Sequence, residues 1–169
     1  FVARTLDTDM KHMIHTFKAA QAHKGTSFIE VFQNCVIFND KTFDSVTART
    51  VKGDQLLVLE EGRPLIFGSD RDKGIRLNGL DPEIVTLGDD VKEEELLVHR
   101  PSSPNSVYAG ILAQMTYPTF PTPVGILRQL NGRETYEDAL CQQIEMARSN
   151  TADNLQELLT GKNSWVVEG

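Results

Sequence analysis

Cys35 is the residue of this sequence best placed to do chemistry. It follows the alternating apolar and polar residues of 28–32, where the pattern breaks at Gln33 and Asn34. Ends of strands are where α/β folds commonly bind their ligands. Residue chemistry leaves three roles open: a nucleophile, a ligand of a metal cluster, or a core residue. No histidine is placed by sequence to act as a base, and an iron–sulfur cluster usually takes four cysteines, so these considerations favour the core.

The other candidate ligands are weaker. His12 and His15 have a spacing that could hold a metal, but they flank the apolar stripe of a predicted helix, which favours a surface or interface role. His23 lies in the last predicted turn of that helix, where a partly charged imidazole interacts favourably with the helix dipole. His99 has no evident partner. Cys141 lies beside the apolar stripe of a later predicted helix, so core packing is its expected role.

A second candidate site is the segment 71–79, which concentrates Arg71, Lys73 and Arg76 around glycines. Cations and exposed backbone N–H groups can together cradle a phosphate or a carboxylate. The alternative is a solvated basic turn on an acidic surface, and composition favours this alternative.

The composition excludes several classes of protein. The chain has 169 residues, of which 40% are hydrophobic and 24% are charged, as expected for a soluble globular protein. Its net charge of -7 and the lack of a clustered basic face argue against nucleic-acid binding. No apolar stretch approaches the roughly 20 residues of a membrane span. The 2 cysteines are far apart, which predicts no disulfide framework and a reducing, cytoplasmic setting.

The elements that must position Cys35 are a strand, a helix and a strand within residues 1–38. "FVART" predicts the first strand, Asp7 to Asp9 offer caps for a helix that stops at Gly25, and "TSFIEVFQ" predicts the second strand. Such a βαβ unit places its strands parallel and adjacent. The chain opens with Phe inside a predicted strand and has no signal peptide, which predicts a fragment or a processed product.

The sequence beyond residue 39 is less regular. A hairpin over 55–68 with its turn near Glu61-Gly62 is expected first, followed by a long loop-rich segment over 69–90. The remaining expectations are a short acidic helix start over 92–99, a helix from Asn105 or Ser106 to about Met115, and an extended or irregular proline-rich segment over 116–130. An amphipathic helix over 134–150 follows, and then a short helix that ends at Gly161 before an apolar terminal strand or tail.

These residues carry a family resemblance. "FIEVFQNCVIFND" resembles the end of the thiamine-diphosphate-binding subunit of 2-oxoacid:ferredoxin oxidoreductases, where the strand runs into a cysteine and then an apolar-aromatic-asparagine run. "LEEGRPLIFGSDRDKGIRLNG" and "YPTFPTPVGILR" resemble the C-terminal extension of the β subunit in the 2-oxoglutarate-type members. The resemblance covers essentially the whole chain. It implies an α/β fold, with the C-terminal βαβ of a thiamine-diphosphate-binding parallel-sheet domain in 1–38 and a loop-rich α+β C-terminal extension in 39–169.

The resemblance also implies an activity. The complete enzyme would oxidatively decarboxylate a 2-oxoacid, here 2-oxoglutarate, to an acyl-CoA and CO₂, and pass electrons through a 4Fe–4S cluster to ferredoxin. It implies thiamine diphosphate, Mg²⁺ and the cluster as cofactors. The implied partners are the α subunit, ferredoxin, CoA and the 2-oxoacid.

In this family Cys35 matches the fourth ligand of the cluster. The other three cluster cysteines and the GDG…N motif that binds magnesium diphosphate are absent from these residues, so the chain is expected to be inactive by itself. Segment 71–79 is then expected at a subunit interface. The rival interpretation is a non-catalytic interaction module that docks a partner through its loop-rich middle; the sequence upstream of Phe1 would separate the two.

Overall fold

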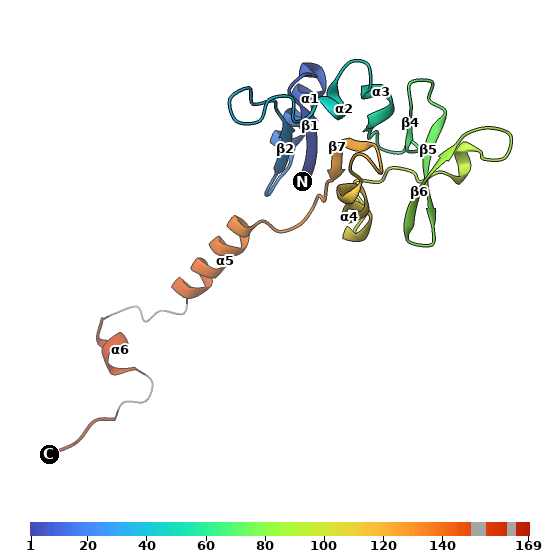
Figure 1. The fold of residues 1–169 in the computed structure, drawn as a ribbon. Coiled ribbons are helices and arrows are strands. Elements are labelled where there is room, and N and C mark those ends of the chain that lie inside the picture. Colours follow the sequence, from blue (N-terminus) through green and yellow to red (C-terminus); the bar gives the residue numbers. More distant parts are fainter. Residues whose placement is uncertain (150–154, 162–164) are drawn as a thin grey trace. The chain divides into compact units, whose positions relative to one another are not determined.

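The computed structural model describes residues 1–149, 155–161 and 165–169. It divides into two compact units, Phe1–Arg133 and Glu134–Gly169, each of which is described separately. The first unit holds a mixed four-stranded sheet, a three-stranded antiparallel sheet and the helices around them (Figure 1). The predicted α/β class is confirmed, because helices accompany a sheet that includes parallel strand pairs.

The predicted βαβ unit is present. Strand β1 (Val2–Leu6) and strand β2 (Phe28–Phe32) pair in parallel, and helix α1 (Met10–Ala22) connects them. The Asp9 carboxylate caps α1 by accepting the His12 backbone N–H at 3.0 Å, a bond that satisfies one of the unpaired donors of the first turn. The helix ends before Gly25, with His23 as its C-cap.

The four-stranded sheet has the order β2-β1-β7-β3. Strand β7 (Thr122–Arg128) runs antiparallel to β1 and parallel to β3 (Leu56–Val58). The proline-rich segment is therefore extended, as predicted, and it supplies a central strand. Gly125 is required there: its φ is 126°, and a Cβ would lie 2.9 Å from the carbonyl oxygen of Leu59.

The predicted hairpin over 55–68 is wrong, because its two strands belong to different sheets. Strand β3 pairs with β7, whereas β4 (Ile66–Phe67) pairs with β5 (Lys73–Asn78) in the second sheet, of order β4-β5-β6. The loop-rich segment expected over 69–90 is also wrong, because β5 and β6 (Asp81–Thr86) form an antiparallel hairpin. Gly79 has a φ of 66° in its tight connection, where an L side chain would be strained.

Four shorter helices complete the first unit: α2 (Asp44–Thr47), α3 (Lys52–Gln55), the 3₁₀ helix η1 (Glu93–Glu95) and α4 (Ser106–Gln114). The predicted cap of α4 is confirmed, since the Asn105 side-chain oxygen accepts the Val107 N–H at 2.9 Å. The acidic helix start predicted over 92–99 corresponds to η1.

The core joins the two sheets and α4. Its fully buried members are Leu57 of β3, Leu65, Ile75 of β5, and Leu112 and Met115 at the end of α4. Burying a leucine or isoleucine side chain contributes about 1.5–3 kcal/mol. The second sheet is therefore held to the first by packing of apolar side chains.

The second unit contains helix α5 (Tyr136–Ser149) and helix α6 (Leu155–Thr160). The amphipathic pattern correctly predicted α5, and Gly161, with a φ of 63°, follows α6 as expected. Cys141 is exposed on α5, so its expected core role is wrong. Residues 165–169 form no strand, and the remaining expectations for 150–154 and 162–164 lie outside the described residues. No described helix is long and apolar enough to cross a membrane.

Candidate functional site

Cys35 lies beyond the edge of the sheet at which β1 and β2 end. Because these strands are parallel, Leu6 pairs with Phe32, and the residues after both strands leave the sheet at the same edge. The two exits are linked, since the Asn34 backbone N–H donates to the Asp7 carboxylate at 3.3 Å. The predicted position of the cysteine, just past the end of a strand, is confirmed.

The thiol of Cys35 is exposed, so the core role that residue chemistry favoured is wrong. The pKa of the thiol is lowered, chiefly by the backbone N–H group of Phe38 and then by that of Ile37. Thiolates are the form that attacks electrophiles and binds metals. No hydrogen bond among the described residues joins Cys35 to a histidine, so the geometry suits a ligand better than a base-activated nucleophile.

The segment between β2 and α2, residues 33–43, is termed the cysteine loop. The side chain of Asn34 contacts the far end of this loop: its Oδ1 accepts the Lys41 backbone N–H at 2.8 Å, and its Nδ2 donates to the Asp40 carboxylate at 2.9 Å. The Asn39 N–H donates to the Cys35 carbonyl at 2.9 Å. The loop is thus closed by hydrogen bonds within itself.

Aromatic stacking anchors the base of the loop to the sheet. The rings of Phe32 and Phe43 stack with centroids 4.4 Å apart. The buried Arg4 guanidinium lies 5.3 Å from the Phe32 centroid, donates to Glu30 at 2.7 Å and donates to the Pro123 carbonyl at 3.2 Å. Since the loop is fixed at both ends, Cys35 has a defined position relative to the sheet edge.

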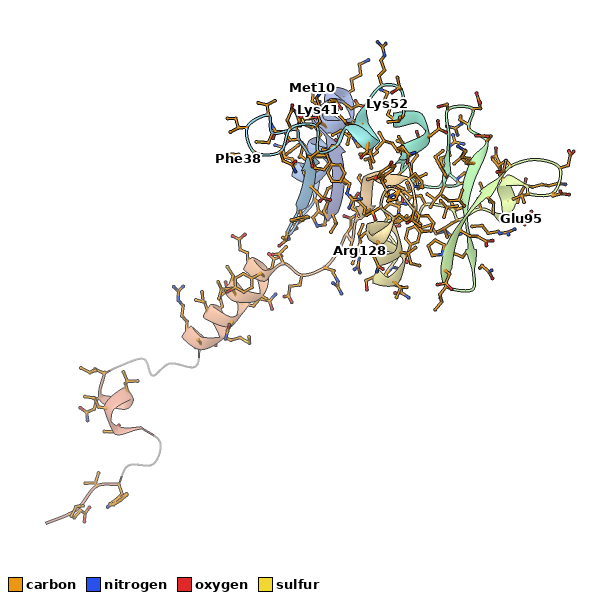
Figure 2. All side chains as sticks on the ribbon, viewed as in Figure 1. Met10, Phe38, Lys41, Lys52, Glu95 and Arg128 are labelled. Atoms are coloured by element: carbon orange, nitrogen blue, oxygen red, sulfur yellow. The ribbon has the colours of Figure 1, made fainter. Side chains whose placement is uncertain are left out.

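The tip of the cysteine loop is apolar and uncovered. Val36, Ile37 and Phe38 are 73, 82 and 89% exposed, and Figure 2 shows Phe38 at the outer end of the loop. Contiguous exposed apolar groups typically mark a surface that another chain or ligand covers. The thiol is therefore flanked by side chains suited to excluding water once a partner is in place.

The described residues do not form a complete metal site, since they contain no group of three or more His, Cys, Asp or Glu side chains that could hold an ion. The pair His12 and His15 belongs to no such group. His12 is half-buried and its Nδ1 lies 2.8 Å from the Thr5 hydroxyl oxygen. Burial lowers the pKa of His12, while the nearby Asp9 carboxylate acts in the opposite direction.

His99 is a core residue, and the expectation that it has no partner is wrong. Its Nε2 lies 2.9 Å from the Ile126 carbonyl, so this nitrogen carries the proton, and its Nδ1 accepts from the Tyr108 hydroxyl at 2.8 Å. Burial lowers the pKa of His99 and raises the pKa of Tyr108 to about 12. His99 therefore links Tyr108 of α4 to Ile126 of β7 inside the core.

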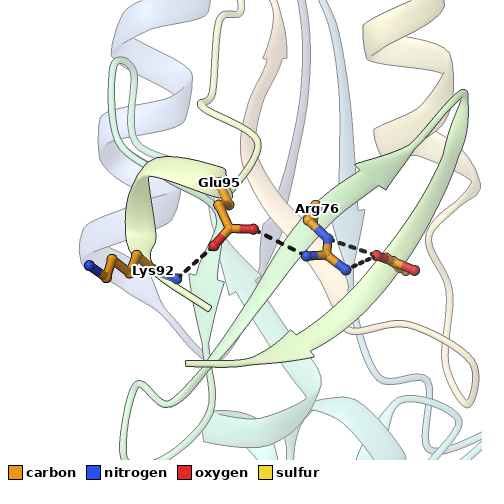
Figure 3. Close-up of polar contacts among 4 residues, drawn as sticks. Arg76, Lys92 and Glu95 are labelled. Carbon is orange, nitrogen blue, oxygen red and sulfur yellow. Dashed lines mark hydrogen bonds and ion pairs between the residues drawn. The ribbon is translucent and has the colours of Figure 1, made fainter. Parts of the chain in front are cut away.

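The basic segment 71–79 is mostly strand β5, which differs from both the predicted anion cradle and the predicted basic turn. Lys73 donates to the Asp54 carboxylate at 2.8 Å, and this contact raises the pKa of Lys73. Arg76 donates through Nε to Glu83 at 2.7 Å and through a terminal nitrogen to Glu95 at 3.2 Å (Figure 3). Both cations are therefore occupied by carboxylates of their own chain.

Arg71 is the remaining cation of that segment, and it lines a groove of about 590 Å³ beside β3 and β4. The groove is lined by three cationic and three anionic side chains. The cations are Lys52, Arg63 and Arg71, and the anions are Asp9, Glu60 and Glu93. The signs are equal in number, so the groove has no electrostatic preference for an anion.

Comparison with known proteins identifies the chain as a homologue of a 2-oxoglutarate oxidoreductase subunit. That relative is KorB of Mycobacterium tuberculosis, which is 32% identical over 173 residues that include 99% of this chain. The chain spans 45% of the length of KorB. No protein-family model matches the chain, and no solved structure matches it. The similarity to KorB confirms the family resemblance that the sequence predicts.

Sequence reasoning missed Asn34, which it treated only as the point where the strand pattern breaks. The available signal was its amide side chain immediately before Cys35, with Asn39 and Asp40 close behind in the sequence. Such short polar side chains commonly bond to nearby backbone groups and stabilise compact loops.

Proposed function

We propose that this chain is the C-terminal part of the β subunit of a 2-oxoacid:ferredoxin oxidoreductase that acts on 2-oxoglutarate. The complete enzyme would convert its substrate to an acyl-CoA and CO₂ and deliver the electrons to ferredoxin. One observation carries the proposal: in a homologue of an oxidoreductase subunit, an exposed thiol with a lowered pKa lies at the edge where parallel strands end.

Cys35 fits a single ligand position of a 4Fe–4S cluster. Iron–sulfur clusters are held by thiolates, and hydrogen bonds to their sulfurs help set the reduction potential. The backbone N–H groups of Phe38 and then Ile37 lower the pKa of the Cys35 thiol, which favours the thiolate form. Within the unit Phe1–Arg133 Cys35 is the single thiol, so we propose that the other three ligands come from the rest of the complete subunit. A bound cluster would supply one-electron transfer.

No described residue is assigned to thiamine diphosphate or Mg²⁺, which the rest of the complete subunit would bind. We propose residues 1–38 as the end of the thiamine-diphosphate domain and 39–169 as the C-terminal extension. Strands from both segments pair in the β2-β1-β7-β3 sheet, so the extension would be attached to the domain by main-chain hydrogen bonds. Without those cofactors this chain would be inactive by itself.

An uncovered apolar face supports the idea that further chain packs here. Met10, Ile14 and Phe17 are exposed on one side of α1, and Phe28 is exposed on β2, an edge strand of its sheet. Exposed edges and apolar faces favour association. We therefore expect the isolated chain to self-associate in solution, which analytical ultracentrifugation would detect; a monodisperse monomer with a sharp melt would indicate a self-sufficient domain.

The proposed function is tested with the complete protein and its partner α subunit. We expect reduction of ferredoxin that requires both 2-oxoglutarate and CoA. We also expect this activity in extracts of the cytoplasm, the reducing compartment in which such an enzyme would work. If a different 2-oxoacid supports the reduction of ferredoxin, the proposed enzyme class stands and the proposed substrate is wrong. Absence of electron transfer from any 2-oxoacid tested would overturn the proposal.

A second candidate is a non-catalytic interaction module. The observation that favours it is the exposed apolar stripe of α5, which includes Tyr136, Leu140 and Ile144. Its docking surface would be this stripe or the cysteine loop, since the middle segment forms the β5–β6 hairpin. Finding a GDG…N motif and a CxxC pair in the complete protein would favour the enzyme, and their absence there would favour the module.

A further inference from the structure

One side chain holds the two ends of the cysteine loop together. Asn34 stands at the start of the loop, and its amide contacts residues at the far end: Oδ1 accepts from the Lys41 backbone N–H at 2.8 Å, and Nδ2 donates to Asp40 Oδ1 at 2.9 Å. Its own backbone N–H donates to Asp7 at 3.3 Å, which ties the same residue to the end of β1. Asn34 thus uses its backbone N–H and both polar groups of its side chain.

The backbone at the far end of the loop depends on this contact. Lys41 has a φ of 61°, in the left-handed region that is sterically disfavoured for a residue with a Cβ. The Lys41 backbone N–H donates its hydrogen bond to Asn34 Oδ1. The side chain of Asn34 therefore stabilises a conformation that Lys41 would otherwise seldom adopt. Loss of that bond would release the turn that closes the loop.

The position of the thiol follows from the closure. Cys35 lies between the two ends that Asn34 joins, and its carbonyl oxygen accepts the Asn39 backbone N–H at 2.9 Å. Val36, Ile37 and Phe38 are largely exposed, so burial contributes little to holding them. The hydrogen bonds inside the loop, rather than packing, therefore hold Cys35 in place.

We propose that Asn34 is a positioning residue for the cluster ligand: by joining residues 34, 40 and 41 it fixes the position of the Cys35 sulfur. This proposal rests on the proposed function, in which Cys35 ligates the cluster. Groups that orient a metal ligand typically change metal affinity or activity by about 10–100-fold when removed.

The test uses a set of variants in the complete enzyme, purified without oxygen. Asn34→Ala removes both side-chain bonds. Asn34→Asp keeps an acceptor for the Lys41 N–H but sets a second carboxylate against Asp40. The double change Asn34→Asp with Asp40→Asn restores the hydrogen bond between side chains 34 and 40, with residue 40 now the donor. Asn131→Ala, at an exposed position outside the loop, is the matched control.

The readouts are the rate at which a ferrous-iron chelator removes iron and the electron paramagnetic resonance spectrum of the reduced cluster. We expect Asn34→Ala and Asn34→Asp to release iron about 10–100-fold faster and to alter the spectrum at an unchanged melting temperature of the protein. The double variant should recover most of the wild-type rate, and Asn131→Ala should match wild type.

Two results overturn the positioning role: a wild-type release rate and spectrum in Asn34→Ala, or a double variant no better than Asn34→Asp. A parallel Cys35→Ser variant separates this failure from failure of the proposed function. If Cys35→Ser loses iron while Asn34→Ala behaves as wild type, only the positioning role is wrong. If Cys35→Ser keeps its iron, the cluster ligand itself is wrong.

Discussion

The cysteine loop and the basic segment 71–79 both concentrate chemically capable side chains, but their polar groups have different partners. In the loop, Asn34 bonds to the neighbouring backbone and to Asp40, and the Cys35 thiol remains exposed. In the basic segment, Lys73 and Arg76 are paired with carboxylates of their own chain. A cluster of cations in sequence is therefore no measure of available charge, whereas local polar residues beside a cysteine can leave its thiol available.

The largest loss of stability is expected from Gly74→Ala in the basic segment. An alanine Cβ there would lie 2.5 Å from a methyl carbon of the buried Leu96, and overpacking of this kind typically costs about 1–3 kcal/mol. We expect a lower midpoint of urea unfolding and, in the complete enzyme, an unchanged iron content. Iron loss without loss of stability would show that the segment serves the site directly.

The second effect uses His99, a titratable group that is buried and fully bonded. Its pKa is lowered from 6.5 in the folded chain, so below about pH 6.5 the unfolded chain binds the proton more readily than the folded chain. The free energy of unfolding should therefore fall as pH drops from 7 towards 5.5, by at most about 1.4 kcal/mol per pH unit for one proton.

His12 contributes with the same sign, because its pKa is also lowered. The comparison of wild type with His99→Gln isolates the contribution of His99 to the pH dependence of the free energy of unfolding. Thermal unfolding across this pH range should show a shallower dependence in the variant. Equal slopes in the two proteins would contradict the assignment of a neutral, buried His99.

The smallest effect is expected from Arg76→Gln. The change leaves Glu83 and Glu95 without their cation, but the pair is solvent-exposed enough for salt to screen it. A slight drop in melting temperature that vanishes in 1 M salt is expected. In the complete enzyme the KM for the 2-oxoacid should stay unchanged; a salt-sensitive rise in KM would show that Arg76 steers substrate instead.

Local signals predicted the parts of the fold that local contacts determine. The strand, the Asp9-capped helix and the second strand follow from periodicity within adjacent residues, and so does the parallel pairing of β1 and β2. The hairpin over 55–68 failed because β3 finds its partner in β7, far along the chain. The β5–β6 hairpin was missed although Asn78-Gly79 is a turn signal, because the density of Gly, Asp and Asn in the segment indicated a loop.

For the candidate site too, local signals predicted only what neighbouring residues determine. The position of Cys35 after a strand could be predicted from the alternation that precedes it. Its exposure could not, because burial depends on what the cysteine loop packs against, and composition favours burial of a lone cysteine. The closure by Asn34 depends on bonds that span the loop, which only the three-dimensional arrangement reveals.

The most direct test of the central claim is the iron content of Cys35→Ser in the complete enzyme. Serine offers a hard oxygen where iron–sulfur chemistry prefers a thiolate. We predict less iron per β subunit, an altered cluster spectrum and slower ferredoxin reduction, while Cys141→Ser, at the exposed cysteine of α5, changes none of these. Wild-type iron content and a wild-type spectrum in Cys35→Ser would contradict the account.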